Sequence, residues 1–263
     1  RVATMGRDDF FANERSITLT AARLDLTQNS EYLRTLTPAA AVITLELATQ
    51  GNLTFAALKM DQLRFFLDGN APLMNLLYEL IFSRLSGVRI SDGTDDPAHV
   101  VMLSKETVRP VGFGAEESLL DFDARSFVGY RLLSEYFAFS DKFMFFDLTG
   151  LDHPKLLHGG KTLRIQLLLS HYAETERHAR LLQTLCAQNF KLGCVPVVNL
   201  FQQAADPIRI THQQATYPVV VDGRKPGAFE VYSIDSVVRV EKDASLETHE
   251  EVPPFYSIHH FSG

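Results

Sequence analysis

Short segments in which apolar and polar residues alternate recur along most of this chain, and this pattern constrains the fold more than any other feature. Every second residue from Leu163 to Leu169 is leucine or isoleucine, and the same alternation runs from Ile43 to Leu47. Because successive side chains of a β-strand point to opposite faces, this spacing predicts strands with one apolar face. We therefore expect a fold built mainly from β-sheet.

The first of these strands contains an irregularity. Its apolar positions begin at Ile17 and end at Leu26, but the alternation changes parity near Ala21 and Ala22. A β-bulge inserts one extra residue, which moves the following side chains to the opposite face. The sequence therefore predicts a bulge at this point.

Helical spacing replaces the alternation after a predicted strand at residues 61–69. Asn70 can cap a helix there, and Pro72 fits its first turn, where a missing amide donor does little harm. Leucine and isoleucine then recur every three or four residues up to Ile81, which predicts one apolar face. We expect Gly87 to end this helix.

Aromatic residues are concentrated at residues 125–151, which hold eight of the chain's 27 Phe and Tyr residues. A helical stripe from Gly129 to Phe137, capped by Ser126 or Asp123, precedes an apolar run typical of a strand buried on both faces. Large apolar side chains with such periodicity are usually interior. We expect the core here to contain Leu132, Leu133, Phe137, Phe143, Phe145 and Phe146.

The end of the sequence has short segments rich in Val and aromatic residues, separated by Pro, Gly and Asp, which is typical of strands. They are residues 194–201, 217–221, 229–234 and 237–242. The whole chain predicts an α+β fold that is predominantly β, with sandwich-like modules and two or three amphipathic helices. We also expect a domain boundary near residue 115. Residues 1–115 would form a β-rich module with one helix, and residues 116–263 would form an α+β module that ends in short strands.

Composition excludes several kinds of partner. The net charge of −7 and the pI near 5.7 give no concentrated positive field, so we expect no nucleic acid partner. No apolar run reaches about 18 residues, so we expect no membrane insertion.

Cys186 and Cys194 form no CxxC pair, which suits a reducing cytoplasm. The chain begins at Arg1 and not at methionine, so we expect a piece of a longer protein.

HGGKT, at residues 158–162, is the pattern closest to a phosphate-binding loop. A P-loop needs a glycine where this chain has Lys155, and it must open a helix, whereas the following residues alternate as a strand. We therefore expect a turn between strands, with no bound nucleotide and no other cofactor.

Two pairs of polar residues are candidates for metal binding or acid–base chemistry. His171 and His178 lack the HExxH and HxxxH spacings, and a zinc site would need further ligands. Asp121 and Asp123 would share one strand face, yet such neighbours are too close for an inverting glycosidase pair, and Asp123 is better placed as a helix cap. GxSxG is also absent. We expect no catalytic residues, no metal site and no enzyme activity.

Two alternatives to a structural protein stay open. A carbohydrate- or peptide-binding β-sandwich module fits the strand content, although the absence of Trp removes the usual platform for stacking sugars. A hydrolase could assemble its site from distant carboxylates, or from His171 and His178. Saturable glycan binding would favour the first alternative, and zinc retained after dialysis would favour the second.

Several blocks of sequence are informative because of their order. They are LRFFLDGN (63–70), LLYELIFSRL (76–85), DARSFVGYRLLSEYFAFSDKFMFFDLTGL (123–151), CVPVVNLF (194–201), AADPI (204–208), YPVVVD (217–222), EVYSIDSV (230–237) and PFYSIHH (254–260). In this order they resemble the TssF family, also called VasA or ImpG, which are wedge components of the bacterial type VI secretion baseplate. The resemblance runs from about Arg7 to the end of the chain.

This resemblance implies a structural, cytoplasmic protein with no catalytic residues. Family members assemble with TssG and TssE into wedges around the VgrG hub, and TssK connects the baseplate toward the inner-membrane complex. The assembled baseplate primes the polymerisation of sheath and tube. We therefore expect contacts with these proteins, and with sheath proteins or another TssF copy.

Such a protein works through exposed side chains, and aromatic residues and arginine are enriched at protein interfaces. Within the aromatic region we expect an exposed minority, Tyr130, Tyr136 or Phe139, to form an interface hot spot. Arg125 and Arg131 can make bidentate pairs with carboxylates, either within the fold or across subunits.

Overall fold

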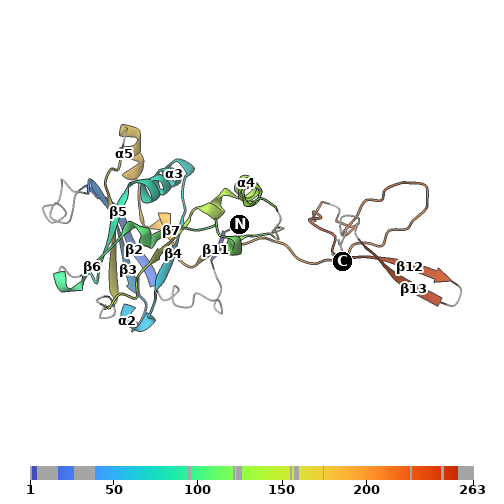
Figure 1. Cartoon of the computed structure of the whole chain (residues 1–263), viewed down its shortest axis with the longest axis horizontal. Coiled ribbons are helices and arrows are strands. Elements are labelled where there is room, and N and C mark those ends of the chain that lie inside the picture. Colours follow the sequence, from blue (N-terminus) through green and yellow to red (C-terminus); the bar gives the residue numbers. More distant parts are fainter. Residues whose placement is uncertain are drawn as a thin grey trace, which may run out of the picture. The chain divides into compact units, whose positions relative to one another are not determined.

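The computed structural model describes residues 2–4, 17–26, 39–93, 96–120, 122, 126–154, 156, 160–173, 175–225, 227–243 and 246–253. Contacts divide the chain into two units, Arg1–Val198 and Asn199–Gly263 (Figure 1). The strands of the first unit are β1 (Val2–Thr4), β2 (Ile17–Leu26), β3 (Ala41–Thr49), β4 (Gln62–Leu67), β5 (Leu85–Ser91), β6 (Val100–Leu103), β7 (Val108–Pro110), β8 (Phe145–Thr149), β9 (Thr162–Leu169), β10 (Phe190–Lys191) and β11 (Cys194–Pro196).

Among the described residues of the first unit, the helices are shorter in total than the strands. The α-helices are α2 (Phe55–Leu58), α3 (Ala71–Glu79), α4 (Val128–Ala138) and α5 (Glu176–Leu182). A π-helical turn, η3 (Leu80–Arg84), follows α3, and the 3-10 turns are η4 (Pro97–His99), η5 (Lys105–Thr107), η6 (Ala115–Glu117), η7 (Ser140–Phe143) and η9 (Ala187–Asn189).

One apolar core is shared by the two larger sheets of the first unit. Antiparallel strands in the order β2-β3-β9-β5-β6 form one sheet, and β10-β4-β8-β7 form the other. Leu45 and Leu167 of the first sheet and Phe65 and Phe146 of the second are at most 1 % exposed, and they belong to the same cluster. The predicted α+β class, mostly β, is confirmed.

A bulge interrupts the pairing of β2 with β3, where the sequence predicts one. Leu19 pairs with Leu47 and Ala21 pairs with Glu46, so Thr20 is the extra residue. Its hydroxyl donates a hydrogen bond to the carbonyl oxygen of Glu46 at 3.0 Å.

Helix α3 begins as predicted and ends differently. The side chain of Asn70 accepts a hydrogen bond from the amide of Leu73 at 3.0 Å, which satisfies one of the free donors at the helix start. The helix passes through η3 directly into β5, and Gly87 lies inside that strand, where its register with β9 shifts. The prediction that Gly87 ends this helix is therefore wrong. The predicted apolar face is buried, with Leu73, Leu76, Leu77, Leu80 and Ile81 in the core.

The second unit contains the hairpin β12 (Val237–Asp243) and β13 (Leu246–Val252), whose strands pair from end to end. Residues 217–221 and 229–234 form no strand, so these two predictions are wrong. None of the side chains described in this unit is buried. These segments therefore lack the packed layer that would favour strand pairing, whereas β12 and β13, which are neighbours in sequence, pair without one.

The predicted boundary near residue 115 concerns independent folding and stays a prediction. Strands from both sides of this residue share sheets, since β4 pairs with β8, and β9 lies between β3 and β5. Among the described helices, none has the length and apolar character needed to cross a membrane.

Candidate functional site

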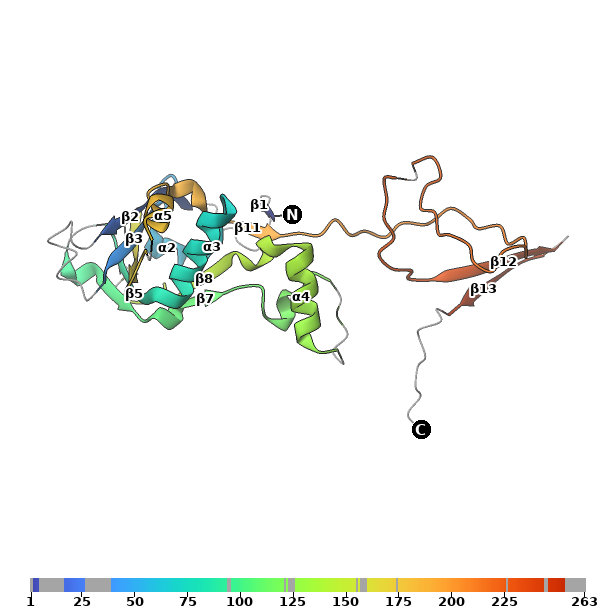
Figure 2. The same ribbon diagram turned by 90° about the horizontal axis from the view of Figure 1, so that it is seen from above.

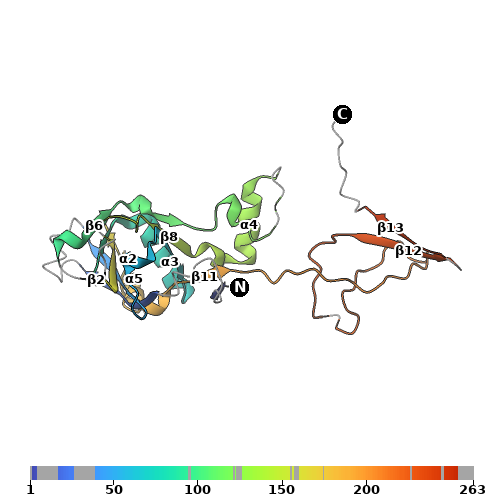
Figure 3. The same ribbon diagram turned by 90° about the horizontal axis from the view of Figure 1, so that it is seen from below.

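Helix α4 lies at one end of the first unit, outside the two sheets (Figures 2 and 3). Phe127 occupies its N-cap position and makes no side-chain capping hydrogen bond, so the predicted cap at Ser126 is wrong. Asp123, the other predicted cap, lies outside the described residues. Helix α4 is followed by η7 and then by β8, which confirms the predicted order of helix and strand.

Aromatic and aliphatic side chains cover the exposed side of α4. The exposed fractions are 70 % for Phe127, 67 % for Tyr130, 57 % for Leu133, 51 % for Tyr136 and 82 % for Phe137. We call these five residues the α4 surface. A surface helix normally turns such residues toward the core, so this arrangement needs a specific cause.

Several of these positions were expected in the core. Leu133 and Phe137 are exposed and Leu132 is half-buried. The prediction that these three side chains of α4 lie in the core is therefore wrong. The other core residues predicted for this region are confirmed, with Phe143 6 % exposed and both Phe145 and Phe146 1 % exposed.

The opposite side of α4 is charged and buried. Arg131 is 5 % exposed, Glu135 is 6 % exposed, and Lys142 of η7 is 1 % exposed. The carboxylate of Glu135 accepts a hydrogen bond from the ammonium group of Lys142, and its Oε2 lies 3.8 Å from Nη1 of Arg131. Burying one of these charges alone would be unfavourable. The ion pairs explain how the polar face can be the buried one.

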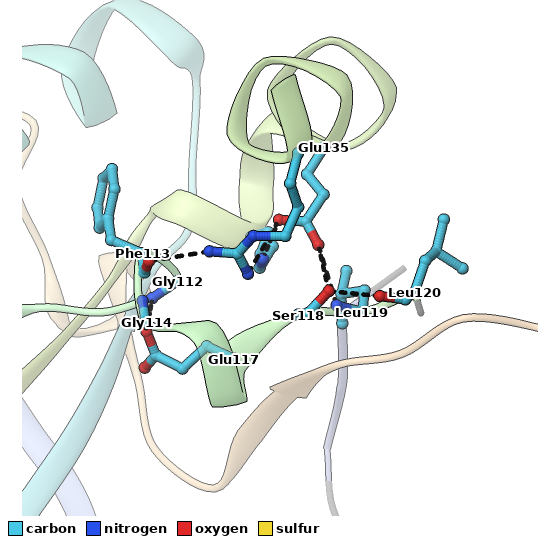
Figure 4. Close-up of polar contacts among 10 residues, drawn as sticks. Gly112, Phe113, Gly114, Glu117, Ser118, Leu119, Leu120 and Glu135 are labelled. Atoms are coloured by element: carbon cyan, nitrogen blue, oxygen red, sulfur yellow. Dashed lines mark hydrogen bonds and ion pairs between the residues drawn. The ribbon is translucent and has the colours of Figure 1, made fainter. Parts of the chain in front are cut away.

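Backbone groups complete the environment of this cluster. The amide of Leu119 donates to Oε1 of Glu135 at 3.0 Å, and the hydroxyl of Ser118 lies 3.4 Å from the same oxygen (Figure 4). Nη2 of Arg131 donates to the carbonyl oxygen of Phe113 at 2.9 Å. Helix α4 is thereby tied to the loop at residues 112–120.

Electrostatics favour the ionised form of Glu135. Burial alone would raise the pKa of this carboxyl group, because it disfavours the charged form. The hydrogen bonds from Lys142 and Leu119, together with the charges of Lys142 and Arg131, outweigh burial and lower the pKa below its ordinary value of 4.5.

The loop beneath α4 is held by a second carboxylate. Glu117 accepts hydrogen bonds from the amides of Gly112 and Gly114, both at 2.8 Å (Figure 4). Arg64 of β4 lies 3.9 Å from Glu117 and pairs with Asp147 of β8, with Nε to Oδ1 at 2.7 Å and Nη2 to Oδ2 at 2.8 Å. The bidentate pair with Asp147 orients Arg64 within the sheet, and the contact of Arg64 with Glu117 connects the loop beneath α4 to that sheet.

A groove of about 540 Å³ separates α3 from α4. Proteins hold small ligands or peptide anchors in hollows of roughly 300–1,000 Å³, so this groove is large enough to accept several side chains. Most of its lining is apolar or aromatic, and the residues that line it are Asn75, Tyr78, Glu79, Phe113, Leu132, Leu133, Tyr136, Phe143 and Met144.

The five predicted site residues have different positions. Tyr130 and Tyr136 are exposed on α4, and Phe139 is half-buried at its C-terminal end. Arg131 is buried and interacts within the fold, with Glu135 and Phe113. Arg125 lies outside the described residues. Whether any of them contacts another protein stays a prediction.

Three residues of the site were not identified from the sequence. They are Glu135 and Lys142, which form the buried ion pair, and Glu79, which lines the groove. Arg131 and Glu135 have opposite charges four positions apart, which places them on the same face of a helix. That spacing could have indicated the pair. Lys142 lies beyond the end of α4, and no spacing rule relates it to Glu135.

The described residues contain no group of three or more His, Cys, Asp or Glu arranged to hold a metal ion. The ring of His171 lies 6.4 Å from that of Tyr172, and the amide of His178 donates to the hydroxyl of Thr175 at the start of α5. Asp121, also considered for chemistry, lies outside the described residues.

Comparisons with known proteins give one consistent result. A family model described as Type VI secretion system, TssF, matches residues 16–263. The type VI secretion system component TssF1 of Pseudomonas aeruginosa is 31 % identical over 199 residues, which are 76 % of this chain and 31 % of that protein. The chain therefore spans about a third of the length of this curated relative.

A solved structure has a similar fold. It is a chain in the cryo-electron microscopy structure of the type VI secretion system TssK-TssF-TssG baseplate subcomplex. The TM-score is 0.62 at 24 % sequence identity, and the match covers 84 % of this chain and 39 % of that chain.

Proposed function

Because the chain belongs to the TssF family of the type VI secretion system, we propose that it forms part of a structural baseplate subunit that assembles through the α4 surface. The observation that carries this proposal is the orientation of α4, which buries Arg131 and Glu135 and exposes its aromatic side chains. Catalysis has no part in the proposed role.

Physical chemistry favours a protein partner for the α4 surface. Monomeric proteins rarely expose large contiguous apolar patches, and such patches mark interaction sites. Burying apolar surface contributes roughly 25 cal/mol per Å², and Tyr is among the residues that dominate interface energies. Since buried ion pairs already fix α4, little conformational entropy would be lost on binding.

The partners that fit this role are TssG and TssK, since the solved subcomplex that contains a similar chain includes them. Contacts with TssE, the VgrG hub, sheath proteins and another TssF copy rest on the family resemblance. A cytoplasmic location and recruitment to the inner-membrane complex have the same basis. The family match supports neither a carbohydrate- or peptide-binding module nor a hydrolase.

Co-purification tests this function. The chain is co-expressed with TssG and TssK, as wild type and as Phe137→Asp, with Met102→Asp of β6 as the matched control because Met102 is an apolar residue that is 50 % exposed. We expect wild type and the control to co-elute with the partners and Phe137→Asp to elute alone while keeping its circular dichroism spectrum. A folded wild-type chain that elutes without TssG and TssK would contradict the proposal.

A further inference from the structure

We propose that the groove between α3 and α4 binds a basic amphipathic segment of a partner protein, whose apolar side chains enter the groove while a Lys or Arg pairs with Glu79. This inference rests on the proposed function, because it assigns one docking site within the assembly. It adds the position of the site and the chemistry of its occupant.

The walls of the groove are suited to apolar anchors. The ring of Phe143 lies 5.0 Å from that of Phe113 and 6.0 Å from that of Tyr136, so aromatic rings from the loop, α4 and η7 form one continuous wall. Leu133 adds an aliphatic side chain that is 57 % exposed. Aromatic and aliphatic pockets of this kind accept the hydrophobic face of a helix.

The charge of the occupant follows from Glu79. Among the described residues that line the groove, Glu79 is the one with a charged side chain. Glu79 is exposed, and no hydrogen bond or ion pair joins its carboxylate to another described residue. A cationic group at the groove edge would be attracted to it, and an anionic one repelled.

A basic partner is favoured over a second copy of this chain. In a symmetric dimer the same surface patch is buried on both copies, so two Glu79 carboxylates would enter one interface, and the described residues that line the groove supply no Lys or Arg to pair with them. The chain as a whole carries a net charge of −7, which adds to the repulsion between copies. Both terms instead favour a partner with positive charge.

The support of the groove is already in place before binding. Tyr136 is on the same helix as Arg131 and Glu135, whose buried contacts fix that helix to the loop that carries Phe113. The walls of the groove therefore need little reorganisation, which favours affinity.

Peptide binding tests the charge of the occupant. Two fluorescent helical peptides share one pattern of Leu and Phe, and they differ in having Lys or Glu beside it. We expect the wild-type chain to bind the Lys peptide about tenfold more tightly than the Glu peptide, and Glu79→Lys to reverse this preference. Glu176→Lys of α5, an exposed control, should bind both peptides as wild type does. An unchanged preference in Glu79→Lys would overturn the proposal.

Assembly tests the groove in the complex. Leu133→Asp and Glu79→Lys are co-expressed with TssG and TssK, and circular dichroism checks that each variant is folded. We expect both to lose at least about tenfold in affinity for the partners, whereas Glu176→Lys assembles normally. Normal assembly of Glu79→Lys, which changes only an exposed side chain, would overturn the groove proposal and leave the proposed function intact.

Light scattering tests whether the groove is instead occupied by a second copy of this chain. A wild-type dimer that Leu133→Asp converts to a monomer would identify a second copy in the groove and overturn the proposal. Failure of folded wild type to assemble with TssG and TssK would contradict the proposed function, while the peptide assay would still judge the groove separately.

Discussion

Glu135 of α4 accepts a hydrogen bond from Lys142 of η7, and both side chains are buried beneath the helix. This pair lets α4 attach to the first unit through its polar face. As a consequence, the aromatic face of the helix is left in solvent, as the proposed assembly through the α4 surface requires.

Removing the carboxylate should destabilise the protein. Glu135→Gln leaves Lys142 and Arg131 buried without their counter-ion, and we expect a loss of about 3 kcal/mol in the free energy of unfolding. The control is Glu176→Gln, which disrupts the exposed pair with Arg180 and should lose less than about 1 kcal/mol. Urea denaturation measures both. Equal losses would show that the buried cluster is not a special source of stability.

The stabilisation by Glu135 should depend on pH. Its pKa is lowered in the folded state, so its contribution is fully present above the ordinary pKa of 4.5 and is lost as the pH falls through the folded-state value. We expect the difference in unfolding free energy between wild type and Glu135→Gln to be largest near about pH 7 and to shrink in acid. A difference that stays constant from neutral pH to acid would contradict the lowered pKa.

Two aromatic residues of the same region should respond in opposite ways to a charge. Phe145 is 1 % exposed and its ring lies 4.6 Å from that of Phe66, so Phe145→Asp should unfold the first unit. Phe137 is 82 % exposed, so Phe137→Asp should change the melting temperature little. Thermal melts of both variants make the comparison, and a large destabilisation by Phe137→Asp would place that ring in a core.

The loop under α4 should be sensitive at Gly112. Its φ is +104°, and an added Cβ would lie 3.0 Å from the carbonyl oxygen of Lys142, so Gly112→Ala should destabilise by about 1–3 kcal/mol. Gly160→Ala is the control because an added Cβ there meets no described residue within 4 Å. Chemical denaturation separates them. Similar stability of the two variants would argue against strain at Gly112.

Local patterns predict those parts of the fold that depend on neighbours in sequence. The bulge at Thr20 and the capped start of α3 at Asn70 were predictable, because alternation and capping are properties of a few adjacent residues. The end of α3 was not, since Gly87 lies in a strand whose pairing is with a distant segment.

The candidate site was only partly predictable. Helical spacing identifies an apolar face on α4, but it cannot say whether that face meets the core or solvent. The decision depends on Lys142 and on the amide of Leu119, which reach Glu135 from outside the helix. In the second unit, Val-rich segments such as residues 217–221 met no partner strand among the described residues, so their propensity was not realised.

Oxidative footprinting of the free and assembled protein is the most direct test of the α4 surface. Phe137 and Tyr130 are 82 % and 67 % exposed in the free chain, and Met102, 50 % exposed on β6, serves as an internal reference. We predict that the oxidation of Phe137 and Tyr130 falls several-fold when the chain is bound to TssG and TssK, while that of Met102 does not change. If each of the three residues is oxidised to the same extent in the free and in the bound protein, the assignment of α4 as an assembly interface is contradicted.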